Sequence, residues 1–147
     1  MSALFDEAMR FVLSVEGGRV DDARDQGGRT AFGITQKAYR AWKHDGTLDV
    51  FDITDADVRA FYADLWESLG VEELPREVAV VHFDSAVHSG SARAITWLRC
   101  STWADVPATA QAFAYLSLRR RFLDQQGPTF HAGFMNRIDA LRKAIGL

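Results

Sequence analysis

Residues 15–35 of this 147-residue chain decide its fold, and they read VEGGRVDDARDQGGRTAFGIT. Before this stretch, apolar residues recur at helical spacing, which predicts an amphipathic helix over residues 3–16. Gly17 and Gly18 end that helix. Residues 18–33 then mix glycine and β-branched residues with charges, which predicts a loop or a small β-hairpin. The chain therefore passes here from a helix into an irregular β element.

The remainder of the chain shows helical patterns that glycine or proline interrupts. Further helices are predicted from Thr35 to Trp42, from Thr54 to Gly70, from Pro75 to Gly90, and over residues 91–99, 106–125 and 133–145. Gly127-Pro128 separates the last two. The sequence thus predicts an all-α domain with one small β-hairpin near its start.

Composition narrows the class of protein. Hydrophobic residues make up 48% and charged residues 25%, a balance typical of a soluble globular domain. No stretch approaches the roughly 18 apolar residues of a membrane span, so no membrane insertion is expected. The N-terminus lacks the pattern of a secretory signal, and Cys100 is the single cysteine. We therefore expect synthesis in the cytoplasm. Cys100 and most of the four tryptophans are expected in the core.

Charge is distributed unevenly along the chain. The net charge of −3 is too small to suggest a nucleic-acid-binding protein. Up to Pro75 there are eight basic and 15 acidic side chains, whereas nine basic and five acidic side chains follow from Arg76 onward. The basic half could bind an anionic polymer such as a cell wall, or residues 119–121, all arginine, could form the solvated face of a helix. Both interpretations stay open at this point.

Glu16 is a candidate general acid. It extends the apolar face of the predicted first helix, so its carboxyl group should point toward the core or a cleft. It also lies at the helix C-terminus, where the helix dipole disfavours a further negative charge. Burial and the dipole both favour the protonated form, as a general acid near neutral pH requires.

Asp25 is a candidate partner for Glu16. It follows nine residues later in a glycine-rich segment, beside Arg24 and near Arg29, which should keep it ionised. Two carboxyl groups in such different surroundings suit glycoside hydrolysis, and the hydroxyl of Thr30 could hold the attacking water. A glutamate at a helix end and an aspartate in a turn are also common structural features. Spacing alone therefore does not decide between a catalytic pair and two structural residues.

A family resemblance adds to this reading. Glu16-Gly17-Gly18, Asp25-x-Gly27-Gly28-x-Thr30 and Phe32-Gly33-Ile34-Thr35 resemble the signature of glycoside hydrolase family 108, the N-acetylmuramidases of phages and prophages. The Asp-to-Thr gap is one residue shorter than in phage-type lysozymes. The likeness continues at Leu74-Pro75 and Phe83–Gly90, and at Phe130–Arg137 it is similar to the end of a peptidoglycan-binding region.

The resemblance implies a lysozyme-like endolysin that cleaves the β-1,4 bond between N-acetylmuramic acid and N-acetylglucosamine. It implies Glu16 as the catalytic acid, with Asp25 and Thr30 as helpers. Contacts to the peptidoglycan substrate are expected from Gly28, Thr35, Gln36, Asp84 and His88. Asp84 and His88, four residues apart, would share the face of a helix that lines the sugar cleft.

The resemblance also implies an organisation and a setting. Residues 1–91 would form the muramidase lobe, and residues 92–147 a helical, peptidoglycan-binding-like lobe packed against it as one compact unit. We expect a monomer without metal or cofactor, since no histidine shows ligand spacing. The protein would act on the cell wall or periplasm after release by a separate holin or secretion partner.

Three positions depart from the family pattern. Arg19 stands where an aromatic residue is usual, His88 where asparagine is usual, and residues 100–107 where relatives carry a DG-x-x-G motif. Two alternatives therefore remain beside the muramidase. One is a lytic transglycosylase, which needs a single catalytic carboxyl group. The other is a non-catalytic wall-binding or secretion-associated module of the same fold.

Overall fold

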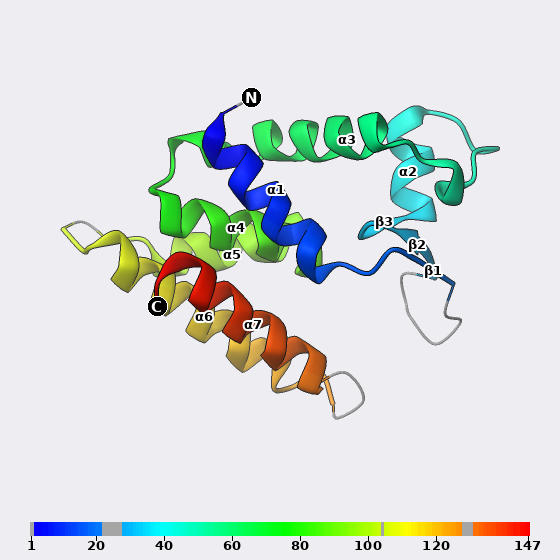
Figure 1. Ribbon diagram of the computed structural model, residues 1–147. Helices are drawn as coiled ribbons and strands as arrows, with labels where there is room; N and C mark the ends of the chain where they lie inside the picture. The colour runs from blue at the N-terminus through cyan, green and yellow to red at the C-terminus, as the bar shows by residue number, and fades with distance from the viewer. Residues whose placement is uncertain (1, 22–27, 104, 128–130) are drawn as a thin grey trace.

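The computed structural model describes residues 2–21, 28–103, 105–127 and 131–147. The elements follow one another as α1 (Ala3–Val15), β1 (Arg19–Asp21), β2 (Arg29–Ala31), β3 (Ile34–Thr35), α2 (Gln36–Lys43), η1 (Val50–Asp52), α3 (Asp55–Ser68), η2 (Val71–Glu73), α4 (Arg76–Ser89), α5 (Ser91–Ser101), α6 (Ala108–Leu123) and α7 (His131–Ile145). The predicted mostly helical class with one small β element is confirmed (Figure 1). The two short 3₁₀ helices, η1 and η2, were not predicted.

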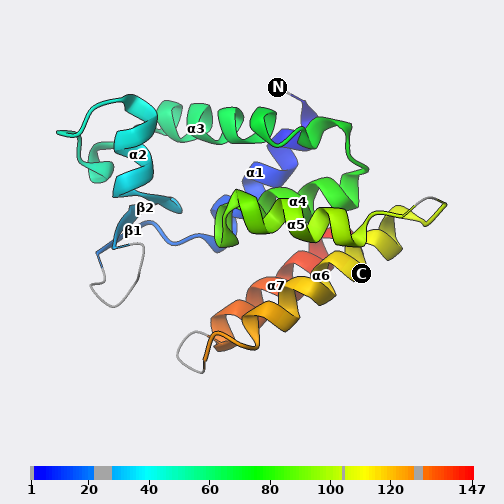
Figure 2. The same cartoon turned by 180° about the vertical axis from the view of Figure 1, so that it is seen from behind.

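Helix α4 is the centre of the molecule. It contacts α1, α5, α6 and α7, and the views from opposite sides show it between α3 and the antiparallel pair α6–α7 (Figures 1 and 2). Every residue from Val78 to Ala86 is buried, as expected of a helix that is covered on all sides. Among the described residues, no helix is both long and apolar enough to cross a membrane.

Helix α1 is held in place near its N-terminus. Its N-cap residue Ser2 accepts a hydrogen bond from the Phe5 amide, and the apolar stripe that begins with Phe5 faces the core. The Phe5 ring packs edge-on against Trp66 of α3 and Phe83 of α4, with centroid distances of 5.5 and 6.3 Å. These contacts fix the direction of α1, and with it the place of Glu16, the residue that follows its last turn.

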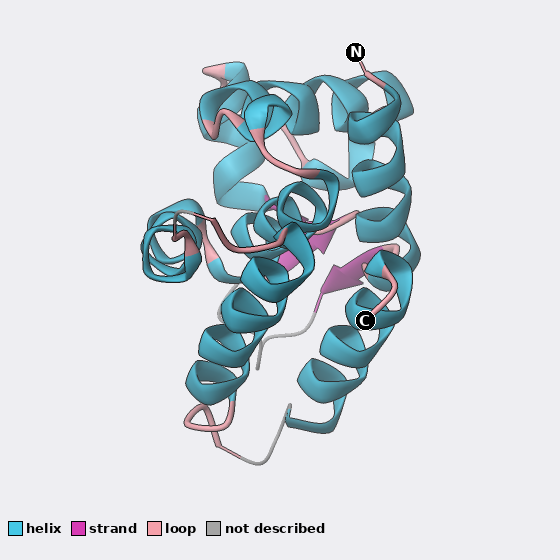
Figure 3. Cartoon of the chain, turned by 90° about the vertical axis from the view of Figure 1, so that its left-hand side faces the viewer, coloured by secondary structure: helices cyan, strands magenta, loops and turns pink. Residues whose placement is uncertain are grey.

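The β element is a three-stranded antiparallel sheet in the order β1-β2-β3. Its strands are drawn in magenta in Figure 3. Thr30 of β2 lies opposite Val20 of β1 and Thr35 of β3. Phe32 and Gly33 form the turn between β2 and β3 with positive φ angles of 53° and 79°. The predicted hairpin is thus confirmed and carries a third, very short strand.

The C-terminal half differs from the sequence analysis at Arg119 and at Cys100. Arg119 is completely buried, whereas Arg120 and Arg121 are exposed. The buried residues of α6, which include Ala112, Tyr115, Leu116 and Leu123, recur at helical spacing, and Arg119 stands on the same stripe. Cys100 is exposed instead of buried, because the buried stripe of α5 runs through other positions, namely Ala94, Trp97 and Ser101. Trp66 and Trp97 are buried as expected, but Trp103 is exposed.

Candidate active site

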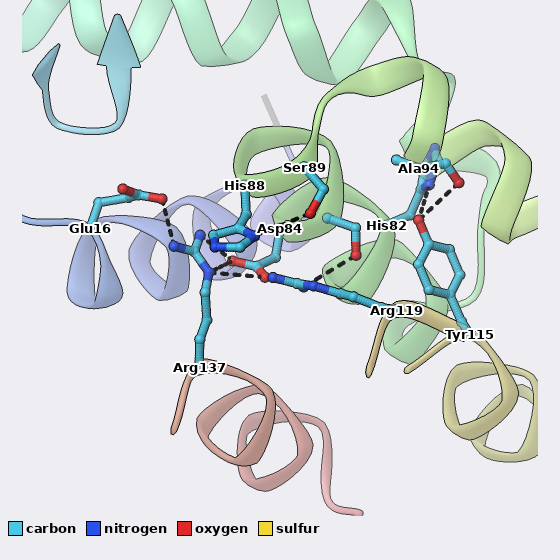
Figure 4. Close-up of polar contacts among 10 residues, drawn as sticks. Glu16, His82, Asp84, His88, Ser89, Ala94, Tyr115, Arg119 and Arg137 are labelled. Atoms are coloured by element: carbon cyan, nitrogen blue, oxygen red, sulfur yellow. Dashed lines mark hydrogen bonds and ion pairs between the residues drawn. The ribbon is translucent and has the colours of Figure 1, made fainter. Parts of the chain in front are cut away.

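Glu16 lies directly after α1 with its side chain 18% exposed. Its Oε1 accepts a hydrogen bond from Nη1 of Arg137 at 2.6 Å (Figure 4). Arg137 belongs to α7, at the other end of the chain, and its side chain is only 8% exposed. The candidate acid is therefore half-sheltered and is held by a cation that comes from the C-terminal helix.

Asp84 of α4 lies behind Arg137 and is completely buried. Arg137 Nη2 donates to Asp84 Oδ1 at 2.7 Å, and Arg119 Nη1 donates to Asp84 Oδ2 at 2.5 Å. Burial alone would raise the pKa of Asp84, but the charges and hydrogen bonds of the two arginines hold it below its ordinary value. Glu16, Arg137, Asp84 and Arg119 thus form one chain of ion pairs, which we call the buried network.

The β2–β3 turn covers another side of Glu16. A Cβ atom added at Gly33 would lie 2.8 Å from both Cδ of Glu16 and Oη of Tyr62, so only glycine leaves room here. Tyr62 Oη donates to the carbonyl oxygen of Phe32 at 2.6 Å, which ties the turn to α3. Burial, followed by the negative charge of Glu16, raises the pKa of Tyr62. The tyrosine therefore remains a neutral donor beside the carboxylate.

A pocket of about 210 Å³ opens beside this turn. Gly33 and Tyr62, the two residues next to Glu16, belong to its lining. The end of α4 and the start of α5 also line it, including Val87 and Ser91. The site thus combines a sheltered carboxyl group with an adjoining, mostly apolar hollow.

The predicted helper residues are only partly visible. Asp25 lies outside the described residues. Thr30 lies in the middle of β2, two residues before the Phe32-Gly33 turn. Gly28, predicted as a substrate contact, precedes β2 with a φ of 59°. How these residues stand toward a sugar stays a prediction.

Two of the predicted substrate contacts support the backbone. Thr35 lines the pocket, and its hydroxyl caps α2 by accepting from the Ala38 amide at 3.1 Å. Gln36 uses both ends of its amide group, since Nε2 donates to the Leu48 carbonyl at 2.7 Å and Oε1 accepts from the Val50 amide at 3.0 Å. In this conformation Gln36 therefore holds the segment before η1.

Asp84 and His88 were expected to share a helix face that lines the sugar cleft, but their surroundings differ from this expectation. Asp84 has no exposed surface through which to touch a sugar, because both its oxygens face arginines in the interior. His88 is half-buried, with Nδ1 3.1 Å from Ser89 Oγ and its ring packed edge-on against Phe134. Burial, followed by the charges of the nearby arginines, lowers the pKa of His88 to about 3. The imidazole is therefore neutral at pH 7.

Sequence reasoning missed Arg137, Arg119, Gly33 and Tyr62 as parts of the site. Arg137 stands at the end of the Phe130–Arg137 run that contributed to the family resemblance, but no role was attached to it. The signal for Arg119 was its place on the buried stripe of α6. Within the described part of the chain, no group of three or more His, Cys, Asp or Glu side chains is arranged to bind a metal ion.

The family model for glycosyl hydrolase 108 matches residues 9–90, more than half of the chain. The chain belongs to glycosyl hydrolase family 108. It is also similar to a solved structure, Brucella abortus SagA, with a TM-score of 0.86 and 28% sequence identity over 96% of this chain and 92% of that one. None of the curated proteins matches the sequence.

These comparisons confirm the predicted lysozyme-like fold class and identify the chain as a glycoside hydrolase. For this family 108 member they support the coarse function of a peptidoglycan hydrolase. Glu16, Gly33 and Asp84 lie within the residues that the family model matches. Arg119 and Arg137 lie beyond its end at residue 90, so half of the buried network comes from outside the matched region.

Proposed function

We propose that this hydrolase is an N-acetylmuramidase that cleaves the β-1,4 bond between N-acetylmuramic acid and N-acetylglucosamine, with Glu16 as its general acid. The observation that carries this proposal is the setting of the Glu16 carboxyl group. The Glu16 side chain is 18% exposed. It lies next to Gly33 and Tyr62, and its Oε1 accepts a hydrogen bond from Arg137. A proton donor for a glycosidic oxygen needs this combination of shelter and access.

In the proposed reaction, Glu16 transfers its proton to the bridging oxygen while the bond from that oxygen to the sugar C1 breaks. The electron pair of the bond goes to the leaving oxygen, and positive charge develops at C1. A water molecule then adds to C1 and releases a proton. We assign this proton to the carboxylate of Asp25 and the placing of the water to Thr30.

The pocket suits part of an N-acetylated sugar. Its apolar lining, which includes Phe61, Ala86 and Val87, could cover an acetamido methyl group, and the Thr35 region would lie along the same sugar. His88 is neutral at working pH, and because its Nδ1 already pairs with Ser89 Oγ, its Nε2 is the nitrogen that can meet a polar group of the sugar. We place His88 at the rim of the substrate site.

The substitution Glu16→Gln tests the assignment of the acid. It keeps the shape of the side chain but removes the transferable proton, so release of soluble fragments from purified peptidoglycan should fall by about 100-fold or more. The thermal unfolding midpoint should stay close to that of the wild type. Glu67→Gln, an exposed position on α3, is the matched control and should leave the rate unchanged. A Glu16→Gln protein with wild-type turnover contradicts the proposal.

Product analysis separates the muramidase from the alternatives. Mass spectrometry of the digest should detect muramic acid with a free reducing end. Anhydro-muropeptides would instead assign the protein to the lytic transglycosylases. Sedimentation with peptidoglycan in the absence of any soluble product would indicate a non-catalytic wall-binding module.

A further inference from the structure

Arg137 bridges two carboxyl groups that lie far apart in the sequence. Its Nη1 donates to Glu16 Oε1 at 2.6 Å, while Nε and Nη2 donate to Asp84 Oδ1 at 3.1 and 2.7 Å. A guanidinium group is planar and rigid, so hydrogen bonds at both of its edges fix its orientation. Once the plane of Arg137 is fixed, the position of Glu16 Oε1 is fixed as well.

Arg137 is itself held from the interior of the molecule. Asp84 supplies a charge from α4, and Arg119 of α6 fixes the other oxygen of Asp84 while also donating to Ser85 Oγ at 3.2 Å. Asp84 and Arg119 are completely buried, and ion pairs in such surroundings are weakly screened. Helices α4, α6 and α7 therefore hold the guanidinium group of Arg137 against the C-terminal end of α1.

We propose that Arg137 is a positioning residue for the proton donor, and that the C-terminal helices take part in catalysis through it. This inference rests on the proposed role of Glu16. Because Arg137 can only donate hydrogen bonds, Oε1 stays an acceptor and the proton resides on Oε2. Oε2 is then the atom that passes its proton to the glycosidic oxygen, and the carboxylate left behind is stabilised by the adjacent guanidinium.

Among the residues that the structure describes, few other titratable side chains act on Glu16 or Arg137. The charged and titratable side chains that act on this carboxyl group or on Arg137 come from α3, α4 and α6, and they are Tyr62, Asp84, His88 and Arg119. His88 titrates at a pKa of about 3, and the pKa of Tyr62 lies above its ordinary value. Within the described network, neither His88 nor Tyr62 therefore changes its charge between pH 5 and pH 9.

The test compares Arg137→Gln and Arg137→Lys by kcat, KM and pH profile on soluble peptidoglycan fragments. In Arg137→Gln, kcat should fall about 10- to 100-fold with little change in KM, because the donor is misplaced. The limb on which activity falls with rising pH should move upward by about one pH unit, because the cation that favours loss of the proton is gone. Arg137→Lys keeps the positive charge but not the planar set of hydrogen-bond donors. The pH at which activity falls should therefore return toward the wild-type value, while kcat recovers only in part.

Arg59→Gln is the matched control, since Arg59 also forms an ion pair with α1, at Asp6 near the other end of the helix. It should alter neither kcat nor the limb. An Arg137→Gln protein with wild-type kcat and pH profile, next to an inactive Glu16→Gln, overturns the positioning role but leaves the muramidase proposal intact. An active Glu16→Gln overturns both. If Arg137→Gln does not fold, Arg137→Lys decides, and a wild-type kcat in that variant rejects the proposal.

Discussion

Two arginine–carboxylate networks of this hydrolase use the same chemistry in opposite surroundings. The buried network joins Glu16 to the helices α4, α6 and α7. The second, which we call the hairpin network, consists of Asp21, Arg29 and Asp49. Arg29 donates to Asp49 with Nε and Nη2, both at 2.9 Å, and to Asp21 with Nη1 at 3.1 Å. Its members are between 36% and 61% exposed.

Each network contains, or flanks in the sequence, one of the two carboxyl groups predicted to carry the chemistry. The buried network contains Glu16. In the hairpin network, Asp21 and Arg29 pair with each other, and Asp25 stands between them in the sequence. In water, an ion pair is weak and is further weakened by salt, but in the interior the loss of one partner leaves an uncompensated charge. The comparison indicates that the fold depends on the first network much more than on the second.

The largest effect is expected from Asp84→Ala. The substitution leaves Arg119 and Arg137 buried without their shared counter-charge, which should lower the free energy of unfolding by about 3–5 kcal/mol. Urea denaturation at pH 7 measures this loss. Asp49→Ala, which removes the corresponding acid of the hairpin network, is the control. Equal losses in the two variants would show that burial does not separate the networks.

Acid should destabilise the protein through its buried histidines. His82 is completely buried, and Tyr115 Oη, 3.0 Å from its Nδ1, donates to the Ala94 carbonyl. Nδ1 therefore carries the proton, and burial lowers the pKa of His82 to about 4. In the unfolded chain the imidazole takes up a second proton near pH 6.5, so the stabilisation is complete above pH 6.5 and is lost as the pH falls toward 4. The loss is on the order of 3 kcal/mol.

Denaturation curves between pH 7 and pH 4 test this expectation, with His82→Leu as the variant. It should flatten the acid-side decline, although His88, with a lowered pKa of its own, contributes in the same direction. His131, which lies with Asp124 on the surface, supplies the exposed counterpart. If His131→Leu flattens the decline as much as His82→Leu, the acid sensitivity does not arise in the interior.

Gly33→Ala should have an intermediate effect on stability and a clear effect on activity. The left-handed backbone at Gly33 disfavours a side chain, at a cost of about 1–3 kcal/mol. The new Cβ would also press on Cδ of Glu16 and displace the donor. Gly70→Ala is the matched control, because Gly70 also has a positive φ but open space around it. Similar turnover losses in both variants would contradict the contact with Glu16.

The sequence allowed the local parts of this fold to be predicted, because helices depend on spacing and end residues that lie close together in the chain. The Thr54 cap of α3 and the end of α1 before Glu16 are of this kind. The bond between Glu16 and Arg137 joins residues 121 positions apart. Periodicity could have placed Arg137 on a buried face of α7, but it does not say which carboxyl group that face meets.

The run of arginines at 119–121 illustrates the same limit in a different way. Neighbouring residues of a helix point in different directions, so one member of a charged run can face the core while the others remain in water. Arg119 does so because it falls on the stripe of Tyr115 and Leu123. A test of periodicity at each position, instead of an average over the run, would have separated it from the others.

The smallest effect on stability is expected from Arg29→Gln. Since the three side chains of the hairpin network are exposed, the unfolding midpoint should change little, and the change should vanish at high salt. Activity is expected to respond more strongly, because Arg29 joins the end of β1 to the start of η1, and Asp25 stands between β1 and β2 in the sequence. Turnover and thermal unfolding of the same preparation, at low salt and in 1 M salt, separate the two quantities. A midpoint that drops as far as in Asp84→Ala would mean that an exposed ion pair supports this fold as strongly as a buried one, and the contrast between the networks would fail.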